Sequence, residues 1–443
     1  IWVWLCGRLQ SSKFTGKNAG DSENFSTLSW PERTIYALSC AALWVALEMI
    51  RARLFSGFPW NFLGVSQVEL LPLIQVASIT GVHGVSFLIV WFSVSLFAGM
   101  TILIQKPSAY RVWIGEIIVP LGMLIAIGIW GYERILAAPP LRRNSLKVAL
   151  IQPSIPQTLI FDAQENPKRF SQLLELSKEA LLEKPDLLIW PEAAMPPFDT
   201  ENVRAITELC VAHRIWMVIG ADDAQISSES SGKNKYNYFN AAFLFDPEGK
   251  PVATYHKQRL VIFGEYVPLD WLPFMKYLTP IGDSFTAGKK PVPFRLSEPD
   301  ANFSTLICFE DVFPHFTSDY VASDTDFLLN LTNDGWFGQS AAQWQQAFAA
   351  VFRCVENGIP LVRCTNNGLT CWIDEWGRMR TIFRGKNGNI YERGFMIAQI
   401  PLLNPGEKRI STFYHQHGEW FGWSCVVTTL IICGRIFLVR KAK

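Results

Sequence analysis

Cys308 is the residue that this sequence presents most clearly as a nucleophile. A thiol nucleophile needs a base to take its proton and a cation to stabilise the oxyanion that its attack creates. Glu192, at the end of the apolar run 187–190, can supply the base, and Lys257 can supply the cation. Glu265, eight residues after Lys257, can hold that lysine or act as a second acid. Glu192, Lys257 and Cys308 together predict acyl chemistry at a thiol.

Each of these residues also has an ordinary structural explanation. A cysteine at the end of a strand is often buried and inert, because free cysteine is among the most buried residue types. Glu192 could cap a helix, Lys257 could be a solvated surface lysine, and Glu265 could be a loop carboxylate. The two acids Glu310 and Asp311 come directly after the cysteine. These acids favour a functional role for Cys308, because acids seldom follow a cysteine that only packs in a core.

The composition excludes several classes of protein. The chain has 443 residues, 49% of them hydrophobic and 13% aromatic, which is too long for one ordinary domain and too apolar for a typical soluble one. The formal net charge of +1 gives no electrostatic basis for binding nucleic acid. The nine Cys show no C-x-x-C pair, and the six His have no metal-site or Ser-His-Asp spacing. We therefore expect no metal and no cofactor.

Four apolar stretches are candidates for membrane-spanning helices, because each approaches the roughly 20 apolar residues that cross a bilayer core. They lie at about 35–50, 83–105, 113–132 and 420–439. The chain opens at Ile1 inside a further apolar stretch, so we expect its membrane part to be truncated at the N-terminus.

Basic residues predict the orientation of these helices. The loop 106–112 and the tail that ends at Lys443 are both basic, so both are expected in the cytoplasm. The region between the last two spans then lies outside the cytoplasm. We predict a membrane domain over 1–139, an extracytoplasmic catalytic domain over 140–415, and a C-terminal span with a basic tail over 416–443.

The central region alternates short strands with helices. Two of its strands flank the turn 246–249 and predict a hairpin. This alternation predicts an α/β sandwich with sheets inside and helices outside. Strands are expected at 148–152, 186–190, 215–220, 240–245, 252–255, 302–308, 327–332, 360–365 and 370–373, and helices at 166–183, 201–213 and 340–356.

Aromatic and polar residues near the predicted strand ends are candidates for a substrate pocket. Asn333, Trp336 and Phe337 follow a strand and could either cap it or line an acyl pocket. Arg363 is most simply a buried ion-pair partner, and it is also a pocket candidate. The remaining candidates from these runs are Trp190, Phe263 and Phe309.

The order of Glu192, Lys257 and Cys308 resembles the Glu-Lys-Cys triad of the carbon–nitrogen hydrolase (nitrilase) superfamily. With apolar helices on both sides, the chain is similar to its bacterial apolipoprotein N-acyltransferase branch. The sequence departs from the family pattern at two positions. Phe309 stands where the family commonly has Tyr, and Phe161 stands where it has Trp, so both positions keep an aromatic side chain. The supporting strings are Trp190-Pro191-Glu192, Phe263-Gly264-Glu265-Tyr266-Val267-Pro268, Ile307-Cys308-Phe309-Glu310, Asn333-Asp334-Gly335-Trp336-Phe337-Gly338, Thr365-Asn366-Asn367-Gly368 and Phe58-Pro59-Trp60.

The resemblance implies a nitrilase-like αββα catalytic domain inserted between transmembrane helices. It implies transfer of an sn-1 acyl chain from a phospholipid, with phosphatidylethanolamine expected, through a Cys308 thioester to the α-amine of a diacylglyceryl-cysteine lipoprotein. Glu265 and Glu310 would support the triad, and Phe161 would join the pocket. The expected setting is the bacterial inner membrane, with the catalytic domain of a monomer in the periplasm. The alternatives are a membrane-tethered amidase that uses water and a catalytically dead lipid-binding module.

Overall fold

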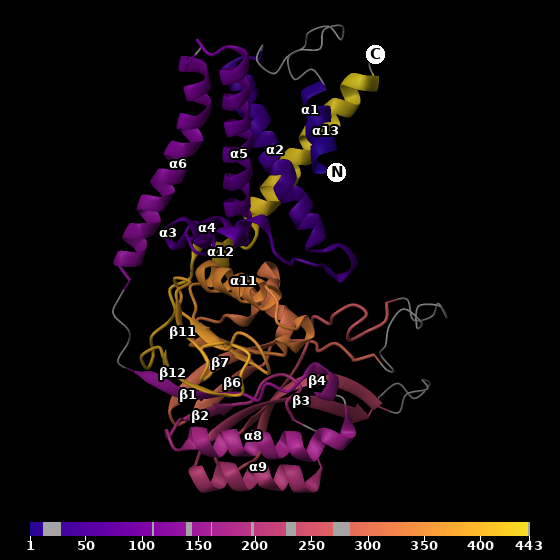
Figure 1. The fold of residues 1–443 in the computed structure, drawn as a ribbon, viewed down its shortest axis with the longest axis vertical. Helices are drawn as coiled ribbons and strands as arrows, with labels where there is room; N and C mark the ends of the chain where they lie inside the picture. Colours follow the sequence, from indigo (N-terminus) through magenta and orange to yellow (C-terminus); the bar gives the residue numbers. More distant parts are fainter. Residues whose placement is uncertain are drawn as a thin grey trace. The chain divides into compact units, whose positions relative to one another are not determined.

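The computed structural model describes residues 1–11, 28–108, 110–138, 144–160, 162–195, 199–226, 236–268 and 284–441. The chain forms two compact units, drawn in Figure 1. Unit 1 comprises Ile1–Ala138 and Thr412–Lys443, and unit 2 comprises Pro139–Ser411. All of the predicted site residues belong to unit 2.

Unit 1 is helical throughout its described part. Helix α2 packs against α5 and α13, and α5 packs in turn against α6. The longer helices are α1 (Trp2–Ser11), α2 (Trp30–Arg51), α5 (Val82–Gln105), α6 (Tyr110–Leu136) and α13 (Trp420–Lys441). Short helices are α3 (Leu71–Ile74), α4 (Ala77–Thr80) and α12 (Phe413–His417), with 3₁₀ turns at Leu54–Ser56 and Leu63–Gln67.

Three of these helices are long and apolar enough to cross a membrane, namely Trp30–Arg51, Val82–Gln105 and Arg111–Leu136. They contain the first three predicted spans. The fourth predicted span lies in α13, where the apolar described part, Trp420–Arg435, is shorter. A membrane crossing at α13 stays a prediction.

Unit 2 contains two six-stranded sheets, with strand orders β12-β1-β2-β3-β4-β5 and β11-β10-β9-β8-β7-β6. The three strands β1, β2 and β3 are parallel, as are β7, β8 and β9, and the outer strands are antiparallel. The first sheet consists of β1 (Ser145–Gln152), β2 (Leu187–Ile189), β3 (Trp216–Ile226), β4 (Tyr236–Phe245), β5 (Pro251–His256) and β12 (Gly394–Pro401). The second consists of β6 (Pro293–Ser297), β7 (Asp300–Ile307), β8 (Phe327–Thr332), β9 (Leu361–Thr365), β10 (Cys371–Ile373) and β11 (Met379–Ile382).

Helices cover the outer face of each sheet. Helices α8 (Asn166–Leu181) and α9 (Thr200–His213) lie on the first sheet, and α11 (Ala342–Asn357) lies on the second (Figure 1). The sheets meet closely, since the Cys364 thiol of β9 lies 3.5 Å from the carbonyl oxygens of Ile151 and Ile189. This layering confirms the predicted αββα sandwich. The short helices of unit 2 are α7 (Gln157–Ile160) and α10 (Pro314–Thr317), with 3₁₀ turns at Ala163–Glu165 and Ser318–Tyr320.

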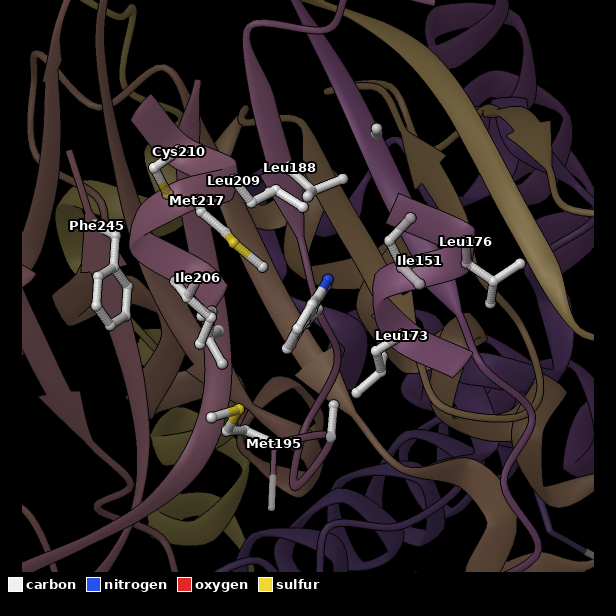
Figure 2. Close-up of a cluster of buried hydrophobic side chains, with 14 of the residues drawn as sticks. Ile151, Leu173, Leu176, Leu188, Met195, Ile206, Leu209, Cys210, Met217 and Phe245 are labelled. Atoms are coloured by element: carbon white, nitrogen blue, oxygen red, sulfur yellow. The ribbon is translucent and has the colours of Figure 1, made fainter. Parts of the chain in front are cut away.

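An apolar core fills the space between the first sheet and its two helices. Figure 2 shows these side chains pointing toward one another from helix and strand. Burial of this kind contributes about 25 cal/mol per Å² of apolar surface, so it fixes the strands whose ends carry the site residues. The helices contribute Leu173, Leu176, Ile206 and Leu209, and the strands contribute Ile151, Leu188, Met217 and Phe245.

Candidate active site

The chain turns sharply at Cys308, directly after strand β7. Cys308 is the first residue of a short 3₁₀ helix, η6 (Cys308–Val312). Its φ angle is +51°, in the left-handed region that costs a non-glycine residue roughly 1–3 kcal/mol. Its carbonyl oxygen accepts hydrogen bonds from Asn330 Nδ2 and Gln346 Nε2, both at 3.0 Å. Surrounding bonds thus hold the turn in place, and backbone strain of this kind clusters at active sites.

Glu192, Lys257 and Glu265 form one ion-paired cluster. Lys257 Nζ lies 3.2 Å from Glu192 Oε1 and 2.7 Å from Glu265 Oε1. Asn240 of β4 donates to the same two carboxylates, with Nδ2 2.8 Å from Glu192 and 3.0 Å from Glu265. Burial alone would lower the pKa of Lys257, but the two carboxylates raise it well above its ordinary value. Lys257 is therefore a permanent buried cation, which is tolerated because it is paired.

Both sheets hold the carboxylate of Glu192. Glu192 follows β2 of the first sheet, and the backbone N–H of Asn333, which follows β8 of the second, donates to its Oε2 at 2.9 Å. The Asn333 side chain is fixed in turn by Gln157 at 2.7 Å and by Asn366 at 2.9 Å. A base held from two sides loses little conformational entropy when it acts, which favours proton transfer in a fixed geometry.

The Cys308 thiol lies in the electrostatic field of this cluster. Burial raises the pKa of the thiol, and the charge of Glu192 raises it further, while Lys257 and a hydrogen bond with Thr332 lower it. The net pKa lies above the ordinary value, so the resting thiol is neutral at physiological pH. A reactive thiolate must then be made by proton transfer to a neighbouring base. Glu192, Lys257 and Glu265 all act electrostatically on Cys308, so the four predicted residues belong to one cluster.

Glu310 joins the two segments that carry the lysine and the cysteine. Its Oε1 accepts hydrogen bonds from the backbone N–H groups of Gln258 and Arg259, at 2.7 and 3.0 Å. Its Oε2 accepts one from Ile307 N–H at 2.8 Å. Burial raises the pKa of Glu310 to about 7, although these hydrogen bonds lower it. Glu310 therefore ties the segment after Lys257 to the η6 turn.

Arg363 lies in the interior of unit 2. Its side chain is fully buried on β9, pairs with Asp311 of η6, and lies 3.5 Å from Asp334 Oδ1. Asp334 begins the 3₁₀ turn η8 (Asp334–Phe337). Arg363 therefore links the turns η6 and η8 through its two carboxylate partners. This agrees with the simpler interpretation of its sequence, a buried ion-pair partner, and removes Arg363 from the pocket candidates. The physical reason is that a buried guanidinium requires carboxylate partners.

Trp190 also belongs to the core. Its side chain is 0% exposed and sits in the cluster between the first sheet and α8. Its indole Nε1 donates to Ser177 Oγ at 2.9 Å, and its ring packs edge-on against Phe170 at 6.0 Å. Trp190 thus packs in the core just after β2, which corrects its assignment to the pocket. Phe161 lies outside the described residues.

The other aromatic pocket candidates are accessible to solvent. Phe263, in the loop after β5, has a φ of +61° and is 36% exposed, and Trp336 of η8 is 56% exposed. Phe337 is half-buried beside it. Phe309, next to the nucleophile, packs edge-on against Phe313 at 5.0 Å. Phe263 and Phe309 come from the segments that also carry Glu265 and Cys308. Trp336 and Phe337 follow Asn333, whose backbone N–H donates to Glu192. A pocket role therefore remains open to all four.

Sequence reasoning missed Asn240 and Thr332. Asn240 lies between Phe239 and Ala241 of β4 and is buried, and a polar residue at the start of the apolar run 239–245 is the one signal that could have identified it. Thr332 is the last residue of β8. Threonine is common in β-strands, so its presence there gives no comparable signal. Among the described residues, no group of three His, Cys, Asp or Glu side chains could hold a metal ion.

The sequence pattern of the Carbon-nitrogen hydrolase family matches residues 147–402, and that of the Apolipoprotein N-acyltransferase N-terminal domain matches residues 9–95. Known apolipoprotein N-acyltransferases are similar over most of the chain. The protein of Geobacter metallireducens is 35% identical, covering 90% of this chain and 74% of its own length. That of Rickettsia prowazekii is 32% identical, covering 90% and 76%.

The chain belongs to the apolipoprotein N-acyltransferase family. A family match of this extent covers unit 2 nearly from end to end and reaches into the apolar helices of unit 1. Among solved structures, an amidase from Nesterenkonia sp. is 18% identical, with a TM-score of 0.41 over 60% of this chain and 94% of that one. Membership in the family supports lipoprotein N-acylation by an acyltransferase with a nitrilase fold.

Proposed function

We propose that this protein moves a fatty acyl chain from the sn-1 position of a membrane phospholipid to the α-amine of a diacylglyceryl-cysteine at a lipoprotein N-terminus. One observation carries the proposal. A strained Cys308, at φ +51°, shares an electrostatic cluster with Glu192 and Lys257 in a chain that also has three helices apolar enough to span a membrane. The names of the relatives support the same acceptor.

The first half-reaction forms a thioester. Glu192 takes the proton of the Cys308 thiol, and the thiolate attacks the ester carbonyl carbon of the phospholipid. The tetrahedral intermediate collapses as the C–O bond breaks, and protonated Glu192 returns the proton to the departing alkoxide. The products are an acyl-Cys308 thioester and a lysophospholipid, so atoms and protons balance.

The second half-reaction transfers the acyl group. The α-amine of the acceptor attacks the thioester carbon, and Glu192 takes a proton from the attacking nitrogen. The C–S bond then breaks, an amide forms, and the thiolate of Cys308 recovers the proton from Glu192. The same carboxylate serves as base and acid in both halves, as covalent catalysis requires.

Lys257 would stabilise the negative charge in both halves. An ammonium has three N–H bonds, and its ion pairs with Glu192 and Glu265 use two of them, so the third can donate to the carbonyl oxygen as it becomes an oxyanion. Transfer of the thiol proton to Glu192 moves negative charge within the cluster without changing its total. A preorganised donor in a site of low dielectric is typically worth 10²–10³ in rate.

Both proposed substrates are anchored in a bilayer, so the apolar helices of unit 1 would hold the enzyme in the membrane that contains them. We place the protein in a bacterial inner membrane, as a monomer with unit 2 on the periplasmic side and phosphatidylethanolamine as the donor. Aromatic residues such as Phe263, Trp336 and Phe337 would shield the thioester from water. Family membership supports a membrane protein that acts on lipoproteins, and the specific membrane, orientation, donor lipid and monomeric state are part of this proposal.

The test is an acyl-transfer assay with the purified full chain, phosphatidylethanolamine and a synthetic diacylglyceryl-cysteine peptide in mixed micelles. We expect a triacylated peptide and an equal amount of lysophospholipid from the wild type. Cys308→Ala should give neither product, and Cys433→Ala, which removes an exposed cysteine of unit 1, should match the wild type. Release of free fatty acid without peptide acylation would favour a hydrolase that uses water. Intact lipid with folded protein would favour a non-catalytic module.

A further inference from the structure

Acyl transfer to the lipoprotein leaves one proton without a destination. An α-amino group has a pKa of about 7.7–8.0, so most acceptor molecules are ammonium ions at pH 7. An ammonium has no lone pair, so it must lose one proton before it attacks, and the attacking nitrogen then loses a second. In the proposed reaction Glu192 carries only the second proton, which returns to Cys308. A second base must take the first proton, an inference that rests on the proposed function.

Asp222 lies on the face of β3 that turns away from the helices α8 and α9. The residues on the other face of this strand pack in the apolar core with those helices, namely Met217, Ile219 and Ala221. Side chains alternate along a strand, so Gly220 and Asp222 point to the opposite face. A Cβ atom at Gly220 would lie 2.8 Å from the Cα atom of Glu192. Glu192 therefore lies over the same face as Asp222.

Asp222 is also the cross-strand neighbour of Asn240. The two residues are paired in the antiparallel register of β3 and β4, which places their Cβ atoms about 4.5–5.5 Å apart on one face. The Asn240 amide donates to Glu192 at 2.8 Å and to Glu265 at 3.0 Å. Asp222 therefore lies next to the side chain that holds both of these carboxylates.

Asp222 is more accessible than the two acids beside it. Asp222 is exposed, whereas Glu192 is only 6% exposed. Glu265 is half-buried, and its oxygens already accept from Lys257 at 2.7 Å and from the backbone N–H of Val261 at 2.8 Å. An amine that arrives from solvent can therefore meet the Asp222 carboxylate before it reaches Glu192.

The surroundings of Asp222 suit a base that works near neutral pH. Desolvation by nearby segments, together with the charges of Glu192 and Glu265, raises the pKa of Asp222 to about 6, while the charge of Arg169 opposes this shift. The carboxylate is therefore ionised at pH 7 and can accept a proton. A base whose pKa approaches that of the amine takes its proton more readily than an ordinary aspartate would.

We propose that Asp222 binds the α-ammonium of the incoming lipoprotein and takes its first proton. One N–H bond breaks and one carboxyl O–H bond forms, so the acceptor becomes a neutral amine and Asp222 a neutral acid. The amine then attacks the acyl-Cys308 thioester with Glu192 as its base, and Asp222 releases its proton to solvent. Over the whole transfer, an ammonium and a thioester give an amide, a thiol and one proton, so atoms and charge balance.

The test compares the wild type with Asp222→Asn in single-turnover transfer from the preformed acyl-enzyme to the synthetic diacylglyceryl-cysteine peptide. About a tenth of the α-amino groups are uncharged at pH 7, and about nine-tenths are uncharged at pH 9. Asp222→Asn should therefore transfer about tenfold more slowly than the wild type at pH 7 and at nearly the same rate at pH 9. The control Asp300→Asn changes an exposed aspartate at the start of β7, the strand whose other end leads to Cys308. It should match the wild type at both pH values.

Two further measurements separate this role from damage to the site. Acyl-enzyme formation needs no amine, so Asp222→Asn should form it within about fivefold of the wild-type rate, because the charge of an exposed group acts weakly on its neighbours. Hydroxylamine is uncharged at neutral pH, so it should cleave both acyl-enzymes equally fast at pH 7.

Three results would overturn the role of Asp222 while leaving the acyl transfer itself in place. They are an unchanged transfer rate in Asp222→Asn at pH 7, a loss of equal size at pH 7 and pH 9, and a comparable loss in cleavage by hydroxylamine. A wild-type protein that forms no acyl-enzyme would instead refute the proposed function, and the role of Asp222 with it.

Discussion

Asn240→Asp replaces the amide that donates to both Glu192 and Glu265 by a carboxyl group of nearly the same shape. The two hydrogen bonds are 2.8 and 3.0 Å long. If the new carboxyl ionised, each contact would become a repulsion of about 6 kcal/mol at an effective dielectric constant of about 20. Two repulsions exceed the attraction of the single cation Lys257. The introduced carboxyl therefore stays protonated near neutral pH.

A protonated carboxyl has one O–H to donate, whereas the amide has two N–H bonds. Asn240→Asp thus loses one of the two hydrogen bonds to the cluster. A hydrogen bond to a charged group contributes about 1.5–3 kcal/mol. If that bond positions Glu192 for proton transfer, acylation of Cys308 should slow about 10- to 150-fold at pH 7. The rate should fall further as rising pH ionises the new carboxyl.

The assay is the rate at which acyl-enzyme accumulates, read by intact mass in quenched samples from pH 6 to pH 9. Asn237→Asp makes the same substitution on the same strand outside the cluster, and it should acylate at nearly the wild-type rate. Thermal unfolding would establish that both variants are folded. A wild-type rate for Asn240→Asp across the whole pH range would refute the role of this amide in holding the base.

Three further predictions concern residues with different roles. Lys257→Ala should slow acylation about 10²- to 10³-fold, and Lys257→Arg should also fail because a planar fork cannot replace a compact ammonium; a loss under threefold in single-turnover assays would remove Lys257 from the mechanism. Burial raises the pKa of Glu310 from 4.5 to about 7, so the proton it holds stabilises the fold fully below about pH 4.5 and progressively less up to pH 7. Glu310→Gln, which cannot ionise, should flatten the dependence of Tm on pH over that range, and an unchanged profile would contradict the assignment. Trp190→Ala should lower the free energy of unfolding by about 3–5 kcal/mol while the folded fraction keeps its acylation rate; normal stability with lost activity would return Trp190 to the pocket.

The interior of the fold could be predicted from the sequence. The strand β8 is buried along its whole length, and four of its six residues are Phe or Leu, which is typical of a central strand. The helix α8 carries Leu173, Leu176 and Leu181 on one buried face, and that spacing is the signature of an amphipathic helix. Buried elements with a regular hydrophobic pattern are the least ambiguous in a sequence.

Three of the four edge strands could not be predicted in this way, whereas the edge strand β5 was expected at 252–255. Strands β6, β11 and β12 were all missed, and each lies at the outer end of its sheet. The strand β6 alternates exposed and buried residues over only five positions, which is too short for a period of two to stand out. The strand β12 pairs with β1 over its whole length, from Gly394 to Pro401, a long-range pairing that no local pattern specifies.

The residues of the candidate site divide in a similar way. Glu192, Lys257 and Cys308 are charged or nucleophilic groups at the ends of apolar runs, so their residue types alone identified them as catalytic candidates. The sequence did not distinguish Trp190 from a pocket residue, because burial depends on the packing of distant segments. Asn240 acts through two carboxylates that are far from it in sequence, and only the fold brings them together.

The most direct measurement is the intact mass of the purified protein after incubation with phosphatidylethanolamine and no acceptor. We predict an added mass of one fatty acyl group that hydroxylamine removes, present in the wild type and in Cys433→Ala and absent in Cys308→Ala. An adduct that survives in Cys308→Ala would contradict a thioester at this cysteine. So would a folded wild-type protein that forms no adduct and leaves the lipid intact.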